Sequence, residues 1–375
     1  MSQSLVEVYP PLPRASDLTL ELDPLASLED APRAEWDALA EQAGNVFATW
    51  EWAAIWWRHF GRGKLLARTC RDRDGRLVGI LPLYLSRVAG LRVIRFLGHG
   101  PGDQLGPICA PAERPAVARA LHAALREVRF DVFLGEEVPQ DAGWGGLLGG
   151  RRLRAVASPL LDLRAAGSWD AFLQRRSAKF RKSLRQQMRR LERDHSVTFR
   201  VCDGADRLRD DLDTLFRLHA MRWNGAESAF TAAEAFHRDF AAAALAREWL
   251  RLCFLEIDGV AVAASLNYRF DGAEFDYQGG RDRAWDRTSV GFLLLAWLVR
   301  GAFEDGLSEY RMLRGGEEWK YRFASDDPGL ETVAVSRGPL GAAALASTPA
   351  LLAARNGLRA VRRAFGSVAE RAQDE

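Results

Sequence analysis

The two halves of this 375-residue chain follow the same order of sequence patterns. The segments DGRLVGILPLY (74–84) and DGVAVAASLNY (258–268), 184 residues apart, share an Asp-Gly pair, an apolar run and a final tyrosine. Asp-Gly between two apolar runs is a strong signal of a β-hairpin. Short apolar runs resemble one another by chance, but here their order, spacing and flanking patterns also agree. The sequence therefore predicts a duplicated unit of strands and helices.

Each half predicts a helical stretch, a hairpin, a further strand, a helix and a last strand. In the first half these lie at 34–60, around Asp74-Gly75, and at 91–98, 112–128 and 130–135. In the second half they lie at 205–248, around Asp258-Gly259, and at 273–280, 289–305 and 309–315. This order predicts an α/β (α+β) fold class with two mixed, mostly antiparallel sheets flanked by helices.

Charge is balanced over the whole chain but not along it. Lys and Arg number 52 and Asp and Glu 50, so the net charge of +2 creates no overall field that favours nucleic acid. The segment 175–193, however, carries nine basic residues and one acid, or +8, which leaves −6 for the rest. Apolar residues at three- and four-residue spacing predict one long amphipathic helix through 168–194. Its basic face is open to three interpretations: a solvated surface, a site for ligand phosphates, or a contact to RNA or anionic lipid.

Other features bear on location and metal binding. The four cysteines are scattered, without the spacing of a metal site, and are expected to be reduced. Residues 1–17 lack the basic and apolar regions of a signal peptide. No apolar run reaches the roughly 18 residues of a transmembrane helix. We therefore expect a cytoplasmic protein that uses no metal.

No Ser, Cys or zinc hydrolase motif and no Walker sequence occurs in the chain. The first candidate site is where the strand at 273–280 leads through RDRAWDRTSVG into the helix at 289–305. A helix start there presents free N–H groups and a positive dipole end, which suit a diphosphate. The expected cap is Thr288 or Ser289, and Gly291 permits close approach of a ligand. Positive charge nearby comes from Arg281, Arg283 and Arg287. The alternative is a capped core helix without a ligand.

The second candidate is the segment LRGGEEWKYRFA (313–324). Its Gly-Gly pair turns the chain at a strand end, and Glu317, Lys320 and Tyr321 follow closely. A lysine at such a place orients an acceptor or stabilises an oxyanion, and Tyr321 or Tyr310 is a candidate general acid toward a thiolate. The alternative is a surface lysine beside a packed Trp319.

A glycine-rich loop of the first half and a strand of the second supply the expected substrate contacts. The loop GHGPGDQLGP (98–107) holds one acid, Asp103, although turn chemistry alone also explains such a loop. We assign substrate contact to Asp103 and, in the strand at 273–280, to Tyr277 and Gln278.

Together these stretches resemble the CelD/BcsL-type acetyltransferases of the GNAT superfamily, bacterial proteins often associated with cellulose or exopolysaccharide production. The resemblance spans roughly 34–336 and rests on an ordered set of stretches. They are FATWEWAAIWWRHFG, DGRLVGILPLY, RFLGHGPGDQLGP, SAKFRKSLRQQMRRLERD, LHAMRWNGAESAF, DGVAVAASLNYRF, FDYQGGRDRAWDRTSVGFLLLAWLVRGAFEDG and LRGGEEWKYRFA. The set is also similar to the Fem-type peptidyltransferases, which pair two GNAT-like units and use aminoacyl-tRNA.

The resemblance implies transfer of an acyl group from acetyl-CoA, or another acyl-CoA, to an amine or hydroxyl. In GNAT folds a loop written Q/R-x-x-G-x-G/A holds the diphosphate, and it corresponds here to 287–292. Arg287 matches, but Val290 stands at the first glycine position, Gly291 comes one residue late, and Phe292 replaces the last small residue, which leaves room for another donor. The implied donor contacts are Arg281, Arg287, Thr288, Ser289, Val290 and Gly291. WKYRF (319–323) resembles the F/Y-K-x-x-F segment of Fem-type enzymes, so the implied catalytic residues are Lys320, Tyr321 and Glu317.

The predicted organisation is a tandem GNAT-like fold. It comprises a flexible arm (1–17), a first unit (18–165), a basic linking helix (166–195), a second, donor-binding unit (196–338) and an amphipathic helical tail (339–375). The expected function is acyl transfer to a sugar or a cell-envelope or exopolysaccharide precursor. The alternatives are aminoacyl-tRNA-dependent transfer, which the basic helix favours, and a non-catalytic subunit of a polysaccharide machine. DNA is not an expected partner, and the tail is a candidate for peripheral contact with the inner face of the membrane.

Overall fold

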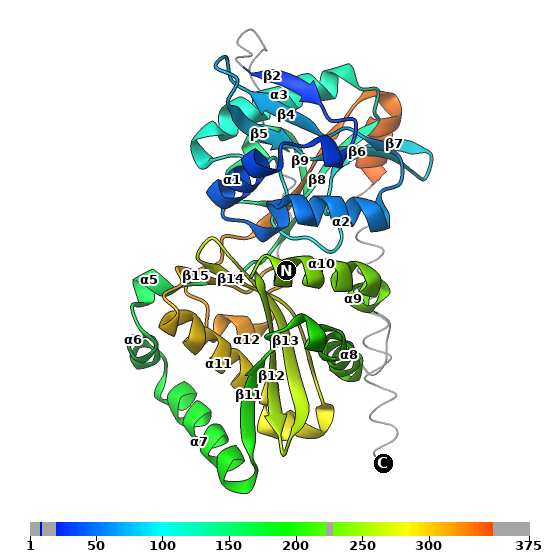
Figure 1. Cartoon of the computed structure of the whole chain (residues 1–375). Coiled ribbons are helices and arrows are strands. Elements are labelled where there is room, and N and C mark those ends of the chain that lie inside the picture. The colour runs from blue at the N-terminus through cyan, green and yellow to red at the C-terminus, as the bar shows by residue number, and fades with distance from the viewer. Residues whose placement is uncertain (1–7, 10–19, 223–227, 348–375) are drawn as a thin grey trace, which may run out of the picture.

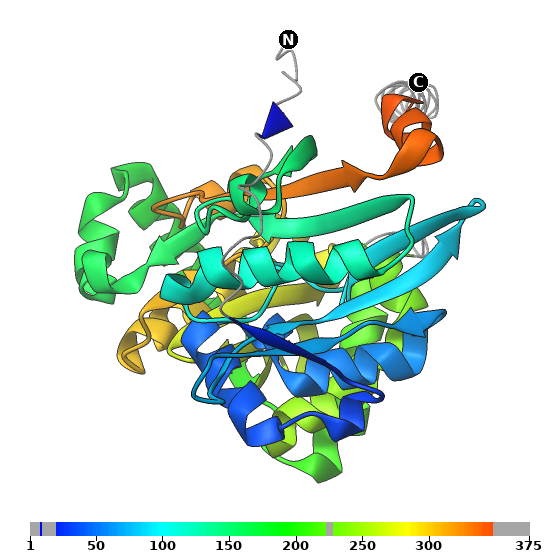
Figure 2. The same cartoon turned by 90° about the horizontal axis from the view of Figure 1, so that it is seen from above.

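The chain folds into two lobes that lie one above the other (Figure 1). The computed structural model describes residues 8–9, 20–222 and 228–347. The upper lobe of Figure 1 contains sheets of seven and three strands, and the lower lobe a sheet of six. Helices lie against the sheets in both views (Figures 1 and 2), and the two large sheets combine antiparallel with parallel pairs. These features confirm the α/β class with mixed, mostly antiparallel sheets.

The strands of the upper lobe form two sheets. The larger has the order β1-β9-β16-β8-β7-β6-β3 and the smaller the order β2-β4-β5. Their bounds are β1 (Val8–Tyr9), β2 (Glu21–Pro24), β3 (Lys64–Leu65), β4 (Arg68–Arg71), β5 (Leu77–Leu81), β6 (Leu83–Val88), β7 (Leu91–Phe96), β8 (Val132–Pro139), β9 (Gly150–Val156) and β16 (Leu330–Ser336).

The strands of the lower lobe form one sheet in the order β10-β15-β14-β13-β12-β11. Their bounds are β10 (Leu160–Asp162), β11 (Val197–Val201), β12 (Leu250–Ile257), β13 (Val260–Phe270), β14 (Ala273–Arg281) and β15 (Glu309–Arg311). The helices are η1 (Leu28–Asp30), α1 (Arg33–Ala43), η2 (Val46–Ala48), α2 (Trp50–Phe60), η3 (Pro111–Glu113), α3 (Arg114–Glu127), α4 (Trp144–Leu148), α5 (Leu163–Ala166), α6 (Trp169–Arg175), α7 (Ala178–Asp194), α8 (Ala205–Arg222), α9 (Ala229–Ala232), α10 (Glu234–Ala246), η4 (Arg283–Thr288), α11 (Val290–Glu304) and α12 (Glu318–Tyr321).

The topology repeats between the lobes. The turns at Asp74-Gly75 and Asp258-Gly259 join β4 to β5 and β12 to β13, as the hairpin signals predict. In the upper lobe β6 and β7 are antiparallel, and α3 leads to β8, which pairs parallel with β7. In the lower lobe β13 and β14 are antiparallel, and α11 leads to β15, which pairs parallel with β14. Each parallel pair is only three residues long.

Two strands pair with the lobe opposite the one in which the sequence analysis places them. β10 lies within 18–165, yet it pairs with β15 in the lower sheet. β16 lies within 196–338, yet it is inserted between β8 and β9 in the upper sheet. Each sheet therefore includes one strand from the other predicted unit. This exchange joins the lobes through backbone hydrogen bonds.

The ends of the described chain belong to the upper lobe. Val8–Tyr9, within the predicted arm, forms β1 and pairs with β9. Residues 338–347 are helical, and Leu345 packs against Val132 and Ala334 of the upper sheet. The remainder of the predicted amphipathic tail, 348–375, lies outside the described residues.

Three elements break where the sequence analysis expected continuity. The helix predicted at 34–60 is divided into α1 and α2, because Gly44 ends α1 with a φ of 57°. The helix predicted through 168–194 is divided into α6 and α7, because the Ser177 side chain caps a new helix start. Pro82 separates β5 from β6 and lies between two different sheets, since proline has no N–H for a ladder.

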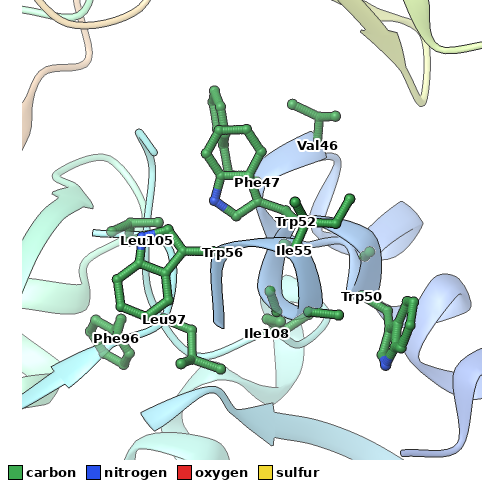
Figure 3. Close-up of a cluster of buried hydrophobic side chains, with 14 of the residues drawn as sticks. Val46, Phe47, Trp50, Trp52, Ile55, Trp56, Phe96, Leu97, Leu105 and Ile108 are labelled. Carbon is green, nitrogen blue, oxygen red and sulfur yellow. The ribbon is translucent and has the colours of Figure 1, made fainter. Parts of the chain in front are cut away.

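A shared aromatic core holds the lobes together. Trp52 and Trp56 of α2 are almost completely buried, and Figure 3 shows them facing Leu97 and Leu105 of the loop after β7. Trp52 also reaches the lower lobe, where its ring lies 5.0 Å from Phe236 and 4.6 Å from Phe240 of α10, centroid to centroid. One hydrophobic cluster therefore extends across both lobes, and the position of the upper lobe over β14 is fixed by packing.

Gly280 of β14 allows α8 to lie directly on the lower sheet. A Cβ at position 280 would stand 2.3 Å from the backbone N of His219 and 2.4 Å from the carbonyl carbon of Leu218. Real Cβ atoms do not approach backbone so closely, so any side chain at this position pushes α8 away.

Gly280→Ala is expected to lower the free energy of unfolding by at least about 2 kcal/mol, because the new methyl group overlaps the α8 backbone. Gly301 in α11 is the matched control, since a Cβ there meets no atom within 4 Å. Gly301→Ala is expected to raise stability by about 0.5–1 kcal/mol through helix propensity. Urea denaturation of both variants checks this, and equal effects of the two would contradict the close approach of α8.

Candidate functional site

The lower sheet opens where β14 and β15 part. The two strands pair through Ala273–Glu309, Glu274–Tyr310 and Phe275–Arg311, and from Asp276 onward no residue of β15 pairs with β14 in the described chain. A cavity of about 670 Å³ lies at this opening. It is bordered by residues 276–281 of β14, residues 312–314 after β15 and the first turns of α11. The backbone edge of β14 is thus exposed to a ligand-sized space.

A β-bulge lies at the point of parting. Leu266 of β13 is opposite Gln278 and Asn267 is opposite Asp276, so Tyr277 is an extra residue without a partner in this register. A bulge takes the backbone groups of the extra residue out of the ladder. Because Tyr277 also lines the cavity, its peptide group lies at the edge of the opening rather than within a continuous ladder.

The N-terminus of α11 lies at the cavity without a side-chain cap. Ser289 occupies the cap position in a left-handed conformation (φ 54°, ψ 43°), and its hydroxyl accepts no hydrogen bond from the helix. Of the two expected cap residues, Ser289 does occupy the N-cap position, but its side chain does not cap the helix. The Phe292 N–H donates to the Ser289 carbonyl oxygen at 2.9 Å, and the positive end of the helix dipole lies at the cavity without a side-chain acceptor from the cap residue. Ser289 and Gly291 both line the cavity.

Charged side chains surround the opening. Five basic residues and four acidic residues line it: Arg222, Arg281, Arg314, Lys320, Arg322, Asp103, Asp276, Asp286 and Glu317. Arg281 pairs with Asp286 at 2.7 Å, and the Arg322 guanidinium lies 4.1 Å from the ring centroid of Phe292. The apolar part of the wall comes mainly from α11, with contributions from Met312, Leu313 and Trp319. A wall of this composition suits a ligand with an anionic end and an apolar arm.

Lys320 closes the turn after β15. Its side chain is almost fully buried, and Nζ donates to the carbonyl oxygens of Leu313 (3.2 Å) and Arg314 (2.7 Å). Glu317 Oε2 lies 3.2 Å from the same Nζ. These three contacts use the three donors of the ammonium group. Lys320 and Glu317 both line the cavity, and together they fix the Gly315-Gly316 turn, which connects the lining residues Arg314 and Glu317.

The two tyrosines considered as general acids lie away from the cavity lining. Tyr321 is 45% exposed and its hydroxyl donates to Asp327 Oδ2 at 2.6 Å. Tyr310 is completely buried and its hydroxyl accepts from Asn267 Nδ2 at 3.1 Å. Burial raises the pKa of Tyr310 well above its ordinary value.

The predicted donor contacts are brought together only in part. Arg281, Ser289 and Gly291 line the cavity. Arg287 and Thr288 lie on η4 and do not line the cavity. Val290, the first residue of α11, is fully buried. Helical geometry explains the division, since neighbouring residues at a helix start point in different directions.

The upper lobe provides one wall of the cavity. In the loop 98–107, Asp103 Oδ2 accepts from the Arg314 backbone N–H (3.0 Å), and Asp103 Oδ1 lies 3.2 Å from Arg314 Nε. The Tyr277 hydroxyl donates to the Pro101 carbonyl oxygen at 2.9 Å. Asp103, Tyr277 and Gln278, the expected substrate contacts, all line the cavity. The site therefore lies at the junction of the lobes.

Sequence reasoning missed Asp276 and Arg222. Asp276 is the first residue of β14 beyond the parting, it lines the cavity, and removal from water raises its pKa to about 6. Arg222 ends α8 and donates to the Gly279 carbonyl oxygen at 3.3 Å. An acid between two aromatic residues, Phe275 and Tyr277, was the available signal for Asp276. No sequence pattern places the end of α8 beside β14.

In the upper lobe, the equivalent gap between β7 and β8 is filled by the loop that follows β7. β7 and β8 also pair through only three residues, ending at Arg95 and Leu134. Beyond them Leu105 of the following loop is buried and its N–H donates to the Glu137 carbonyl oxygen at 2.9 Å. A cavity of about 170 Å³ lies beside this loop. The larger opening is thus in the second half of the chain.

The described residues show neither a metal-ligand cluster nor a membrane-spanning helix. They hold no group of three or more His, Cys, Asp or Glu side chains placed to bind a metal ion. No helix among them is long and apolar enough to cross a membrane.

Residues 178–321 match the model of a family described as an acetyltransferase (GNAT) domain. This part of the chain is thus similar to GNAT acetyltransferase domains. It contains the bulged strand β14, helix α11 and Lys320, so most of the cavity lining lies in the matched part. No curated protein matches the sequence.

Solved structures share the fold of both lobes. The crystal structure of FemX superposes with a TM-score of 0.62 at 10% identity, covering 84% of this chain and 97% of FemX. L-PGS from Bacillus licheniformis gives a TM-score of 0.53 at 16% identity, with 87% and 98% covered. A protein of unknown function from Bacteroides thetaiotaomicron gives 0.52 at 12% identity, with 82% and 98% covered. At such identities the likeness concerns the fold, and the part of this chain that matches the family model belongs to a two-lobed architecture that these structures share.

The Asp103–Arg314 contact is expected to couple the lobes energetically. Asp103→Ala should lower the free energy of unfolding by about 1–3 kcal/mol, because it leaves the Arg314 backbone N–H without its acceptor. Arg314→Ala should also lower it, because it leaves the buried Asp103 carboxyl without its ion-pair partner. A double-mutant cycle should give a coupling energy of at least about 1 kcal/mol. The control cycle is the exposed pair Arg300 and Glu304 of α11, 2.7 Å apart, for which about 0.5 kcal/mol or less is expected. Additive effects at Asp103 and Arg314 would contradict the coupling.

Proposed function

We propose that this protein transfers an acyl group from a CoA thioester, bound in the cavity between β14 and β15, to an amine or hydroxyl. The observation that carries the proposal is the parting of these strands at a bulge, beside an uncapped helix start, within the part of the chain that is similar to GNAT domains. A ligand placed there meets a positive helix end, backbone N–H groups and an apolar wall at successive positions along its length.

Each part of an acyl-CoA has a complementary surface. The α11 N-terminus and Arg281 suit the diphosphate, because N–H groups and guanidinium both bind phosphate oxygens. The apolar wall of α11 suits the pantetheine arm. The peptide N–H at the Tyr277 bulge is placed to polarise the thioester carbonyl, which is where charge develops during attack. Direct attack by the acceptor needs no protein nucleophile.

For the acceptor, we propose a sugar or a cell-envelope or exopolysaccharide precursor, handled on the cytoplasmic side. Support comes from the resemblance to the CelD/BcsL-type acetyltransferases. It also comes from the wall contributed by the loop 98–107, which faces the acyl end of the opening near Tyr277. An open cavity, rather than one filled by side chains, favours an enzyme over a non-catalytic subunit.

A second candidate donor is aminoacyl-tRNA, which the exposed face of α7 favours. Lys179, Lys182, Arg185, Arg189 and Arg190 are exposed and make no ion pair with any described residue. The start of α7 is close to the cavity, since the ring of Phe180 lies 5.6 Å from that of Phe292, which lines it. Such a row of unpaired positive charge suits a phosphodiester backbone.

Acetyl-CoA at 100 times its dissociation constant is expected to stabilise the protein by about 2.7 kcal/mol and to raise its Tm. Gly291→Asp should weaken binding at least tenfold, because a carboxylate at the α11 start repels the diphosphate while it suits the helix dipole. Gly291→Ala is the matched control, since a Cβ there comes no closer than 3.6 Å to Arg281 Cδ. Thermal-shift titration measures all three proteins. Equal donor affinity of Gly291→Asp and Gly291→Ala would refute binding at α11.

If aminoacyl-tRNA is the donor, the variant Lys182→Glu/Arg189→Glu should lose at least tenfold in tRNA affinity, with a flatter dependence on salt. Its acetyl-CoA affinity should not change, because neither residue lines the cavity. Filter binding at two salt concentrations checks this. Tight tRNA binding by the parent protein without any shift by acyl-CoA would replace the CoA proposal with this one.

A further inference from the structure

Asp276 lines the cavity at the point where β14 and β15 part. It is the first residue of β14 past the last pair with β15, and the next residue is the Tyr277 bulge. The carboxyl group and the peptide group proposed to polarise the thioester carbonyl are therefore neighbours at the same end of the opening. A base placed beside the electrophile can remove the proton as the new bond forms.

Ser265 gives the carboxyl group a partner in both protonation states. The Ser265 hydroxyl oxygen lies 3.3 Å from Asp276 Oδ1 and 2.8 Å from Asn267 Oδ1. A hydroxyl has one hydrogen and also accepts. When Asp276 is ionised, Ser265 can donate to it. When Asp276 is protonated, it can donate to Ser265, which then donates to Asn267.

The amide of Asn267 is held in the orientation that this exchange requires. Its Nδ2 donates to Glu274 Oε1 at 2.8 Å and to the Tyr310 hydroxyl at 3.1 Å. Both partners are completely buried, and Glu274 is itself held by Arg269 Nε at 2.8 Å. Because Nδ2 of Asn267 is bonded to Glu274 and Tyr310, its Oδ1 faces Ser265. Three strands thus supply a fixed network behind Asp276.

The charges around Asp276 come from several elements. Lys320 of α12 and Arg222 at the end of α8 favour its ionised form, and Glu274 of the same strand opposes it. Tyr310 of β15 is neutral because burial raises its pKa. Burial of Asp276 outweighs the two cations and raises its pKa to about 6, so the carboxylate dominates at neutral pH and remains basic enough to accept a proton.

We infer that Asp276 is the general base of the acyl transfer and that Ser265 and Asn267 are its positioning residues. This inference rests on the proposed function. The acceptor N–H or O–H gives its proton to an Asp276 oxygen as its lone pair attacks the thioester carbon. The C–S bond breaks, its electron pair leaves on sulfur, and Asp276 passes the proton to the thiolate directly or through solvent. The products are the acylated acceptor and the free thiol.

The test uses the full chain and acetyl-CoA, with water and hydroxylamine as probe acceptors and thiol release as the readout. Asp276→Asn is expected to lower thiol release at pH 7.5 at least 100-fold, with acetyl-CoA affinity unchanged. The parent rate should rise with pH through about 6 and then level, since the ionised form acts. Ser265→Ala should keep some rate but alter the pH profile. Asp239→Asn on α10, remote from the cavity, is the control and should behave as the parent.

Thermal stability provides a readout that does not depend on turnover. A carboxyl whose pKa is raised on folding destabilises the protein as pH rises from its unfolded pKa of about 4 through about 6. Asp276→Asn should therefore raise Tm above that of the parent at pH 8, with a difference that disappears near pH 4. A parent that binds no acetyl-CoA or releases no thiol overturns the proposed function. Equal rates and pH profiles of parent and Asp276→Asn, or no pH-dependent difference in Tm, overturn the role of Asp276.

Discussion

The site depends on how few hydrogen bonds join β14 to β15. Parallel strands usually continue side by side, but here only three residue pairs form before β14 turns away at Asp276. The bulge at Tyr277 increases the divergence, since a bulge adds twist and bends the strand. Backbone groups left without a ladder partner must find other acceptors or donors. In the lower lobe they border a cavity, whereas in the upper lobe the chain itself fills the corresponding gap through Leu105.

This opening is kept in shape from both lobes. β10 and β16 exchange between the sheets, and Trp52 packs against Phe236 and Phe240 across the junction. The loop 98–107 can therefore present Asp103 to Arg314 and Pro101 to Tyr277 at fixed distances. An acceptor that enters beside this loop is bounded by residues from both halves of the chain. The second half of the chain thus provides most of the cavity, and the first half supplies one wall.

Local patterns predicted the fold well, because hairpins, strands and apolar helices are encoded by neighbouring residues. Asp74-Gly75 and Asp258-Gly259 turned the chain as predicted, and α11 ends before Gly306. The breaks at Ser177 and Pro82 followed local capping and proline chemistry that the apolar spacing concealed. The exchange of β10 and β16 could not be predicted, since strand pairing across roughly 150 to 200 residues leaves no local pattern.

The candidate site was predicted in outline. Lys320, Gly291, Arg281 and Asp103 line one cavity, but Lys320 has its three donors on Leu313, Arg314 and Glu317. Its role in holding a turn depends on side-chain packing that spacing does not reveal.

The most direct test of the account is a crystal structure of the chain with acetyl-CoA bound. We expect the diphosphate at the start of α11, the pantetheine arm between β14 and β15, and the thioester carbonyl at the Tyr277 bulge beside Asp276. Density for the donor at another surface, or a β14–β15 opening that stays empty at saturating acetyl-CoA, would contradict it.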